Sequence, residues 1–167
     1  MDVFKEQILK VRKTPAEYML MGIIVIFAAV VSVFLFLYSG QYPFFIVLIV
    51  GIFYGSGKLL GMFSIEYEYI VTNSVIDIDK IISKSSRKRI ASFESKDIIR
   101  CEKAVGTVPV TDATDRFFCC DKDDKNAYWI LVNKNGKKTL IMFAPNEKII
   151  EAIRLSAPKN MQRELFN

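Results

Sequence analysis

The sequence of 167 residues contains no histidine at all. Histidine is the commonest general base near neutral pH and the commonest metal ligand, so its absence removes the usual catalytic pairs and metal sites. The three cysteines (Cys101, Cys119 and Cys120) form no CxxC pair, which suits a reducing cytosol better than a disulfide or metal framework. We therefore expect a protein that is not an enzyme and that carries no metal and no other cofactor.

Two weaker chemical motifs also fail. The acidic run from Asp121 to Asn126 resembles a cation-binding loop, but an EF-hand needs glycine at its sixth position and glutamate at its twelfth, and here those are Asn126 and Val132. The Gly55-Ser56-Gly57 stretch lies inside an apolar run, so it is not a phosphate-binding loop between a strand and a helix. The acidic run is better explained as a solvated hairpin turn.

Charge is missing from one long part of the chain. No Asp, Glu, Lys or Arg occurs in the forty residues from Tyr18 to Gly57. About 20 apolar residues are needed for a helix to cross a bilayer, so we predict transmembrane helices at 18–38 and 44–63, joined by an uncharged loop at 39–43. Thr14-Pro15-Ala16-Glu17 predicts the start of the first helix, with an N-cap, an early proline and a capping-box glutamate.

The flanking charges predict the orientation of this hairpin. Four cations precede the first helix and Lys58 ends the second, whereas the loop between them has no charge. By the positive-inside rule both termini are cytoplasmic and the protein is a two-pass protein of the cell membrane. Residues 1–17 then form a cytosolic segment. Phe4, Ile8 and Val11 share one helical face, so residues 3–13 are either a helix in the membrane interface or an irregular basic lead-in.

Glycine is concentrated in the second predicted helix. Gly51 and Gly55 form one GxxxG pair, and Gly57 and Gly61 form another. Small residues at this spacing allow helices to approach closely. We expect these glycines to pack within the hairpin, with a homo-oligomer as the alternative.

The remaining residues, 64–167, have the pattern of a water-soluble β-rich domain. Seven segments show strand periodicity, and Asn135-Gly136 is a strong hairpin signal between the last two. Pro145-Asn146 and the apolar stripe of Ile149, Ile150 and Ile153 predict a helix at 146–157, which Pro158 ends. The fold class predicted for the whole chain is a membrane α-helical hairpin plus an α+β domain.

The element order resembles the pleckstrin-homology-like fold, a bent sheet or small barrel of about seven antiparallel strands capped by a C-terminal helix. Three stretches, Glu66–Asn73, Asp77–Ile82 and Pro145–Lys148, together with Arg87-Lys88-Arg89, are similar to an uncharacterised bacterial family of small proteins. Its members have two membrane helices and a cytosolic domain of this kind. The resemblance covers nearly the whole chain, is weakest over 104–116, and implies a bacterial cell membrane but no activity.

The cytosolic part is only mildly basic. After Ser64 it has 18 Lys and Arg against 15 Asp and Glu, which is too small an excess for a nucleic-acid-binding surface. The basic residues gather around one predicted turn and comprise Lys80, Lys84, Arg87, Lys88 and Arg89. This basic turn is either a solvated turn that keeps an edge strand soluble or a contact for anionic lipid headgroups.

The sequence therefore favours a membrane-anchored, non-enzymatic binding or scaffold module that presents its cytosolic domain to a protein partner, in the manner of an adaptor. An anionic-lipid sensor that uses the basic turn is the main alternative. A transporter or channel subunit is less favoured, because neither predicted span has an ionisable residue near its centre. The sequence does not identify the partner or a role for Cys119-Cys120.

Overall fold

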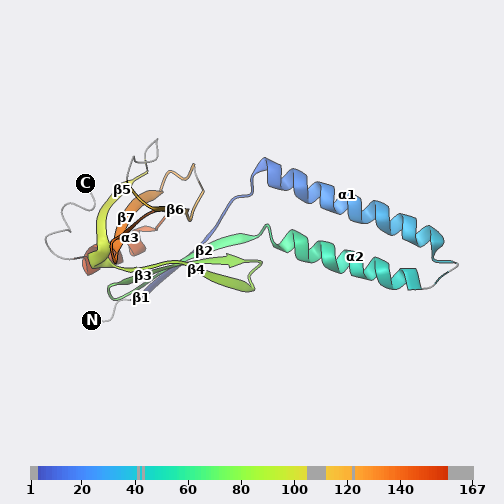
Figure 1. The fold of residues 1–167 in the computed structure, drawn as a ribbon, viewed down its shortest axis with the longest axis horizontal. Coiled ribbons are helices and arrows are strands. Elements are labelled where there is room, and N and C mark those ends of the chain that lie inside the picture. The colour runs from blue at the N-terminus through green and yellow to red at the C-terminus, as the bar shows by residue number, and fades with distance from the viewer. Residues whose placement is uncertain (1–3, 41, 43, 105–111, 122, 158–167) are drawn as a thin grey trace. The chain divides into compact units, whose positions relative to one another are not determined.

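The computed structural model describes residues 4–40, 42, 44–104, 112–121 and 123–157 (Figure 1). The described chain divides into two compact units. One comprises residues 12–65 and 82–84, and the other comprises residues 1–11, 66–81 and 85–167. Residues 41 and 43 of the predicted loop at 39–43, residues 105–111 of the uncertain segment at 104–116, and the tail from Pro158 onward lie outside the described residues.

The first unit is a helical hairpin of α1 (Pro15–Tyr38) and α2 (Phe44–Gly61), whose helices run side by side. Both are long and apolar enough to cross a membrane, with mean hydropathy of 3.0 and 1.9. The predicted cap is confirmed: the Glu17 amide donates to Thr14 Oγ1 at 3.3 Å, and the Thr14 amide donates to the Glu17 carboxylate at 2.6 Å. The helix therefore begins three residues before the predicted span, at Pro15.

The second unit contains two four-stranded sheets. The first has the order β1-β2-β3-β4, formed by Phe4–Lys10, Ile65–Thr72, Val75–Ile82 and Ser86–Glu94. The second has the order β5-β7-β8-β6, formed by Ile98–Lys103, Tyr128–Lys134, Lys137–Phe143 and Asp115–Phe118. A short 3-10 helix, η1 (Ser95–Asp97), leads from the first sheet to the second. Strands β4 and β6 are each at the edge of their sheet.

The N-terminal segment differs from its prediction. Residues 4–10 form β1, which pairs antiparallel with β2 in a register that places Gln7 opposite Tyr69. The Gln7 side chain donates to the Ala144 carbonyl at 3.0 Å and accepts from the Asn146 amide at 2.6 Å. Over residues 4–10 both interpretations, the interfacial helix and the irregular lead-in, are therefore wrong, because the backbone of this segment pairs with β2 as a regular strand.

The seven predicted strand segments are otherwise confirmed, with one difference in direction. Strand β6 pairs with β8 in parallel, opposite Thr139 to Met142, whereas the sequence predicted antiparallel strands throughout. The chain leaves β6 at Phe118 and returns along β7, and β8 then inserts between β7 and β6. This order makes the β6–β8 pair parallel.

The core lies between the two sheets. Tyr69 of β2 is fully buried, stacks edge-on against Phe143 with 5.7 Å between ring centroids, and donates its hydroxyl to the Cys119 carbonyl at 2.6 Å. Helix α3 (Glu147–Ser156) packs against β1 and adds Ile149 and Ile153 to this core, after the predicted Asn146 cap.

Candidate binding groove

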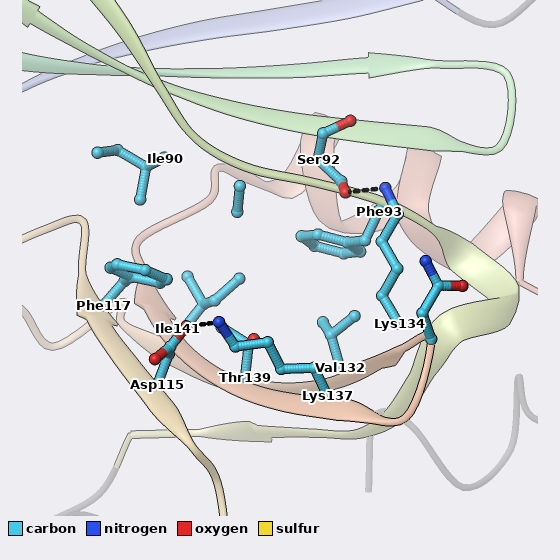
Figure 2. A pocket seen from close by; sticks show the side chains of 12 residues that line it. Ile90, Ser92, Phe93, Asp115, Phe117, Val132, Lys134, Lys137, Thr139 and Ile141 are labelled. Atoms are coloured by element: carbon cyan, nitrogen blue, oxygen red, sulfur yellow. Dashed lines mark hydrogen bonds and ion pairs between the residues drawn. The ribbon is translucent and has the colours of Figure 1, made fainter.

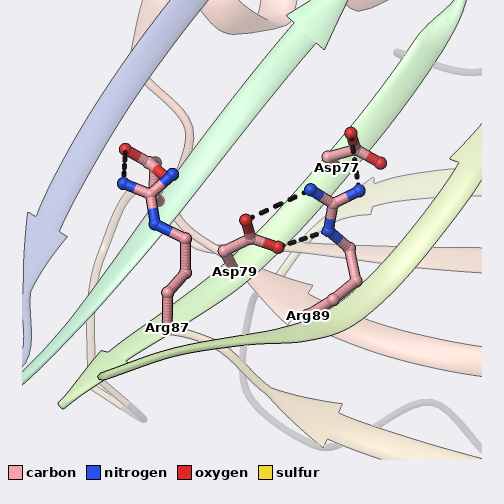
Figure 3. Close-up of polar contacts among 5 residues, drawn as sticks. Asp77, Asp79, Arg87 and Arg89 are labelled. Carbon is pink, nitrogen blue, oxygen red and sulfur yellow. Dashed lines mark hydrogen bonds and ion pairs between the residues drawn. The ribbon is translucent and has the colours of Figure 1, made fainter. Parts of the chain in front are cut away.

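The basic turn predicted from the sequence is partly neutralised by carboxylates on neighbouring strands. Arg87 of β4 pairs with Glu68 of β2 at 2.8 Å, and Arg89 pairs with both Asp77 at 2.9 Å and Asp79 of β3 (Figure 3). Glu68 and Asp79 are nearly inaccessible to solvent. The two arginines therefore act first as counter-ions for buried acids on the sheet.

Burial and these ion pairs shift the pKa values of Glu68 and Arg89. Burial raises the pKa of Glu68, partly offset by the positive charge of Arg87, and the nearby Glu6 and Asp79 raise it further. The hydrogen bond to Asp79 raises the pKa of the Arg89 guanidinium above its already high value. Arg89 consequently stays charged over the whole physiological range and keeps Asp79 paired.

The three lysines of the basic turn have a different environment. Lys84 and Lys88 are exposed and Lys80 is half-buried, and within the described chain no carboxylate pairs with any of them. Ser83 and Lys84 both have positive φ, at 55° and 56°. The Ser83 amide donates to the Ser64 carbonyl at 2.9 Å, which ties this turn to the end of the helical hairpin.

Three of the four glycines of α2 make no close contact within the described chain. A Cβ added to Gly51, Gly55 or Gly57 would have no heavy atom within 4 Å, whereas one added to Gly61 would lie 2.6 Å from Ser83 Oγ. The hairpin therefore does not depend on Gly51, Gly55 and Gly57 for close packing. Gly61 instead leaves room for the β3–β4 turn.

A groove of about 520 Å³ opens between the two sheet edges, and the sequence did not predict it (Figure 2). It lies between β4 on one side and β6, β8 and the β7–β8 turn on the other. Its apolar lining is formed by Ile90, Ala91, Phe93, Phe117, Val132 and Ile141. This volume falls within the usual range for protein ligand sites, and several of the lining residues belong to the core between the sheets.

Two lysines mark the polar rim of the groove. Lys134 Nζ donates to the Ser92 main-chain carbonyl of β4 at 2.7 Å, and Lys137 Nζ pairs with the Asp115 carboxylate of β6 at 2.6 Å (Figure 2). They flank the Asn135-Gly136 turn, which has positive φ at both positions as the hairpin signal predicted. The turn is visible in the sequence, but its position opposite β4 depends on how the two sheets pack.

The described residues offer little reactive chemistry. Burial raises the pKa of Cys101, Cys119 and Cys120 to about 12 each, so these thiols are not activated nucleophiles. In the described part of the chain no three His, Cys, Asp or Glu side chains are grouped so as to hold a metal ion. The groove itself has an apolar floor and two lysines at its rim.

Two four-stranded sheets with an apolar core between them and a C-terminal helix define a pleckstrin-homology-like domain, which follows a helical hairpin in the chain. The family model for the bacterial PH-like domain (DUF6106) matches residues 1–163, and the chain belongs to this family. No curated protein and no solved structure matches the chain. The match includes both apolar helices, so the hairpin is part of the family's architecture.

Proposed function

We propose that the protein is a membrane-anchored, non-enzymatic binding module that holds a protein partner in the groove between β4 and β6. The observation that supports this most directly is the groove itself, because it exposes part of the core between β4 and β6, each of which is an edge strand of its sheet in the described part of the chain. Pockets with an apolar floor and a few polar groups at the rim are typical of binding sites. In this proposal the helical hairpin crosses the bacterial cell membrane and tethers the domain on its cytoplasmic side.

Photo-crosslinking in living cells tests the proposal. A photoreactive phenylalanine analogue replaces Ile90, which lines the groove on β4, in the full-length protein. The matched control replaces Ile99, an exposed isoleucine of β5 that does not line the groove. We expect an adduct of one defined mass from position 90 and none from position 99. Equal labelling at both positions, or none at position 90, contradicts the proposal.

A second candidate function is recognition of anionic lipid, and one contact favours it. The Ser83–Ser64 hydrogen bond places Lys84 in the same compact unit as α2 and its terminal Lys58. If α2 crosses the bilayer, Lys84 is then near the headgroups, where each cation contributes about 1 kcal/mol. Arg87 and Arg89 support this function less, because both are paired with acids.

Lipid retention distinguishes this second candidate from the first. The full-length protein is purified in mild detergent with phosphatidylglycerol or phosphatidylcholine, and the bound lipid is counted by mass spectrometry. Lys84→Asn is the informative variant, because asparagine tolerates positive φ while the charge is lost. Selective loss of phosphatidylglycerol supports lipid recognition, whereas unchanged retention removes Lys84 from any lipid site.

A further inference from the structure

We propose that the groove binds an extended, acidic segment of a partner protein, which adds to the free edge of β4 as a further strand. This inference rests on the proposed function and specifies its ligand. Strand β4 is nine residues long and has a neighbour on one side only, β3, in the described sheet. Such an edge presents a row of backbone donors and acceptors that a second chain can pair with.

The hydrogen bond at Ser92 shows that the backbone of β4 points toward the groove at this residue. Its carbonyl accepts a hydrogen bond from Lys134 Nζ at 2.7 Å, across the groove and away from β3 (Figure 2). In a strand the amide and the carbonyl of one residue point to the same side. The Ser92 amide therefore also faces the groove, which gives a docked strand one donor and one acceptor at this residue.

A change in side-chain alternation opens β4 at this point. Arg89 contacts Asp77 and Asp79 on the outer face of the sheet, whereas Phe93, four residues later, is buried in the core on the other face. Strict alternation would place both on the same face. The side chains of β4 therefore do not keep strict alternation between Arg89 and Phe93, and neighbouring Ile90 and Ala91 both line the groove.

Charge selects the chemistry of the docked segment. Within the described residues Lys134 has no carboxylate partner, and its hydrogen bond is to a neutral carbonyl. A docked strand would donate a backbone amide to the Ser92 carbonyl and place a carboxylate beside Lys134. Lys134 would then exchange its hydrogen bond to a neutral carbonyl for a charge-assisted pair, and the Ser92 carbonyl would keep a hydrogen-bond donor. Lys137 is already paired with Asp115, so one acidic residue opposite Lys134 is the main requirement.

The floor of the groove sets the pattern of the remaining side chains. Successive side chains of a docked strand point to opposite faces, so every second one enters the groove. The apolar floor around Phe93, Phe117 and Ile141 accepts aliphatic side chains there. The inferred ligand is thus an extended segment in which apolar residues alternate with polar ones. One of its polar residues is an aspartate or glutamate that lies opposite Lys134.

Selection from a random library of twelve-residue displayed peptides, on the full-length protein in lipid nanodiscs, tests this inference. We expect enriched peptides with alternating apolar residues and an acidic position. Their affinity should fall about tenfold in Lys134→Gln and become less dependent on salt. It should also fall at least tenfold in Ser92→Pro, which removes the groove-facing amide N–H and restrains φ at this residue, while the matched Ser92→Ala binds as the wild type does.

Several results would overturn the inference. They are the absence of enriched peptides, enrichment without acidic residues, and binding that Lys134→Gln leaves unchanged. If Ser92→Pro does not fold, N-methylation of the peptide amide that pairs with β4 replaces it, and unchanged affinity of that peptide overturns strand addition. If the peptide selection fails but photo-crosslinking in cells still gives an adduct at position 90, the proposed function stands and only the strand-addition inference is overturned. The mass of that adduct distinguishes a second copy of this chain from another protein.

Discussion

Asp79 is buried, and among the described residues Arg89 is the cation that pairs with it. Arg89→Ala should therefore lower the free energy of unfolding by about 1–3 kcal/mol, because a buried charged acceptor is left without its partner. Urea unfolding of the full-length protein in detergent, followed by the fluorescence of Trp129, measures this change. Trp129 is the only tryptophan in the sequence and is buried in the second sheet.

An exposed ion pair provides the control for this experiment. Lys96 pairs with Glu94 at 2.7 Å, but both side chains are largely solvated. Lys96→Ala should leave the unfolding curve unchanged, because surface pairs contribute little to stability. Equal destabilisation by both substitutions would show that the Arg89–Asp79 pair has no special role.

The sequence could show which residues carry charge but not how they pair. Arg87 and Arg89 look like free cations beside a turn, and the acids that neutralise them lie on β2 and β3. Only the strand register brings these groups together, and the register depends on packing of the other face. The same limit hid Lys134, whose hydrogen-bond partner Ser92 is 42 positions away in the chain.

At the scale of single elements, the β7–β8 hairpin depends on a glycine with positive φ. Gly136 has a φ of 80°, and a Cβ at this position would have no heavy atom within 4 Å. Gly136→Ala should therefore destabilise the domain by about 1 kcal/mol through backbone conformation alone. Gly136→Asn should cost less, since asparagine tolerates this region. Thermal unfolding of the two variants compares them, and an equal loss would indicate a steric cause.

Local signals predicted most elements correctly, and the exceptions have non-local causes. The capping box of α1 and the Asn146 cap of α3 involve residues three positions apart, so the sequence shows them directly. β1 was missed because its apolar residues also fit a helical face, and its pairing with β2 spans the whole helical hairpin. The groove was also missed because of a non-local cause: it forms only when the two sheets pack together, and no local sequence pattern shows how they do so.

At the scale of the whole molecule, the hairpin orientation is testable by cysteine labelling. Gly40→Cys places a thiol in the short connection after α1, while the three native cysteines are buried and give little background. We expect a membrane-impermeant maleimide to label it in intact cells. Lys96→Cys, an exposed position in η1, should react only after lysis. The opposite pattern would reverse the proposed topology.

The connection from β1 through α1 and α2 to β2 has a consequence for synthesis. The ribosome makes β1 first, but its partner β2 emerges only after both apolar helices have been translated. The first sheet therefore cannot close until the helical hairpin has left the ribosome. A fragment of residues 64–167 lacks β1, so it would expose the edge of β2 and the Asn146 amide that Gln7 normally accepts from. If the two apolar helices insert into the membrane as they leave the ribosome, the first sheet closes only after the chain is anchored.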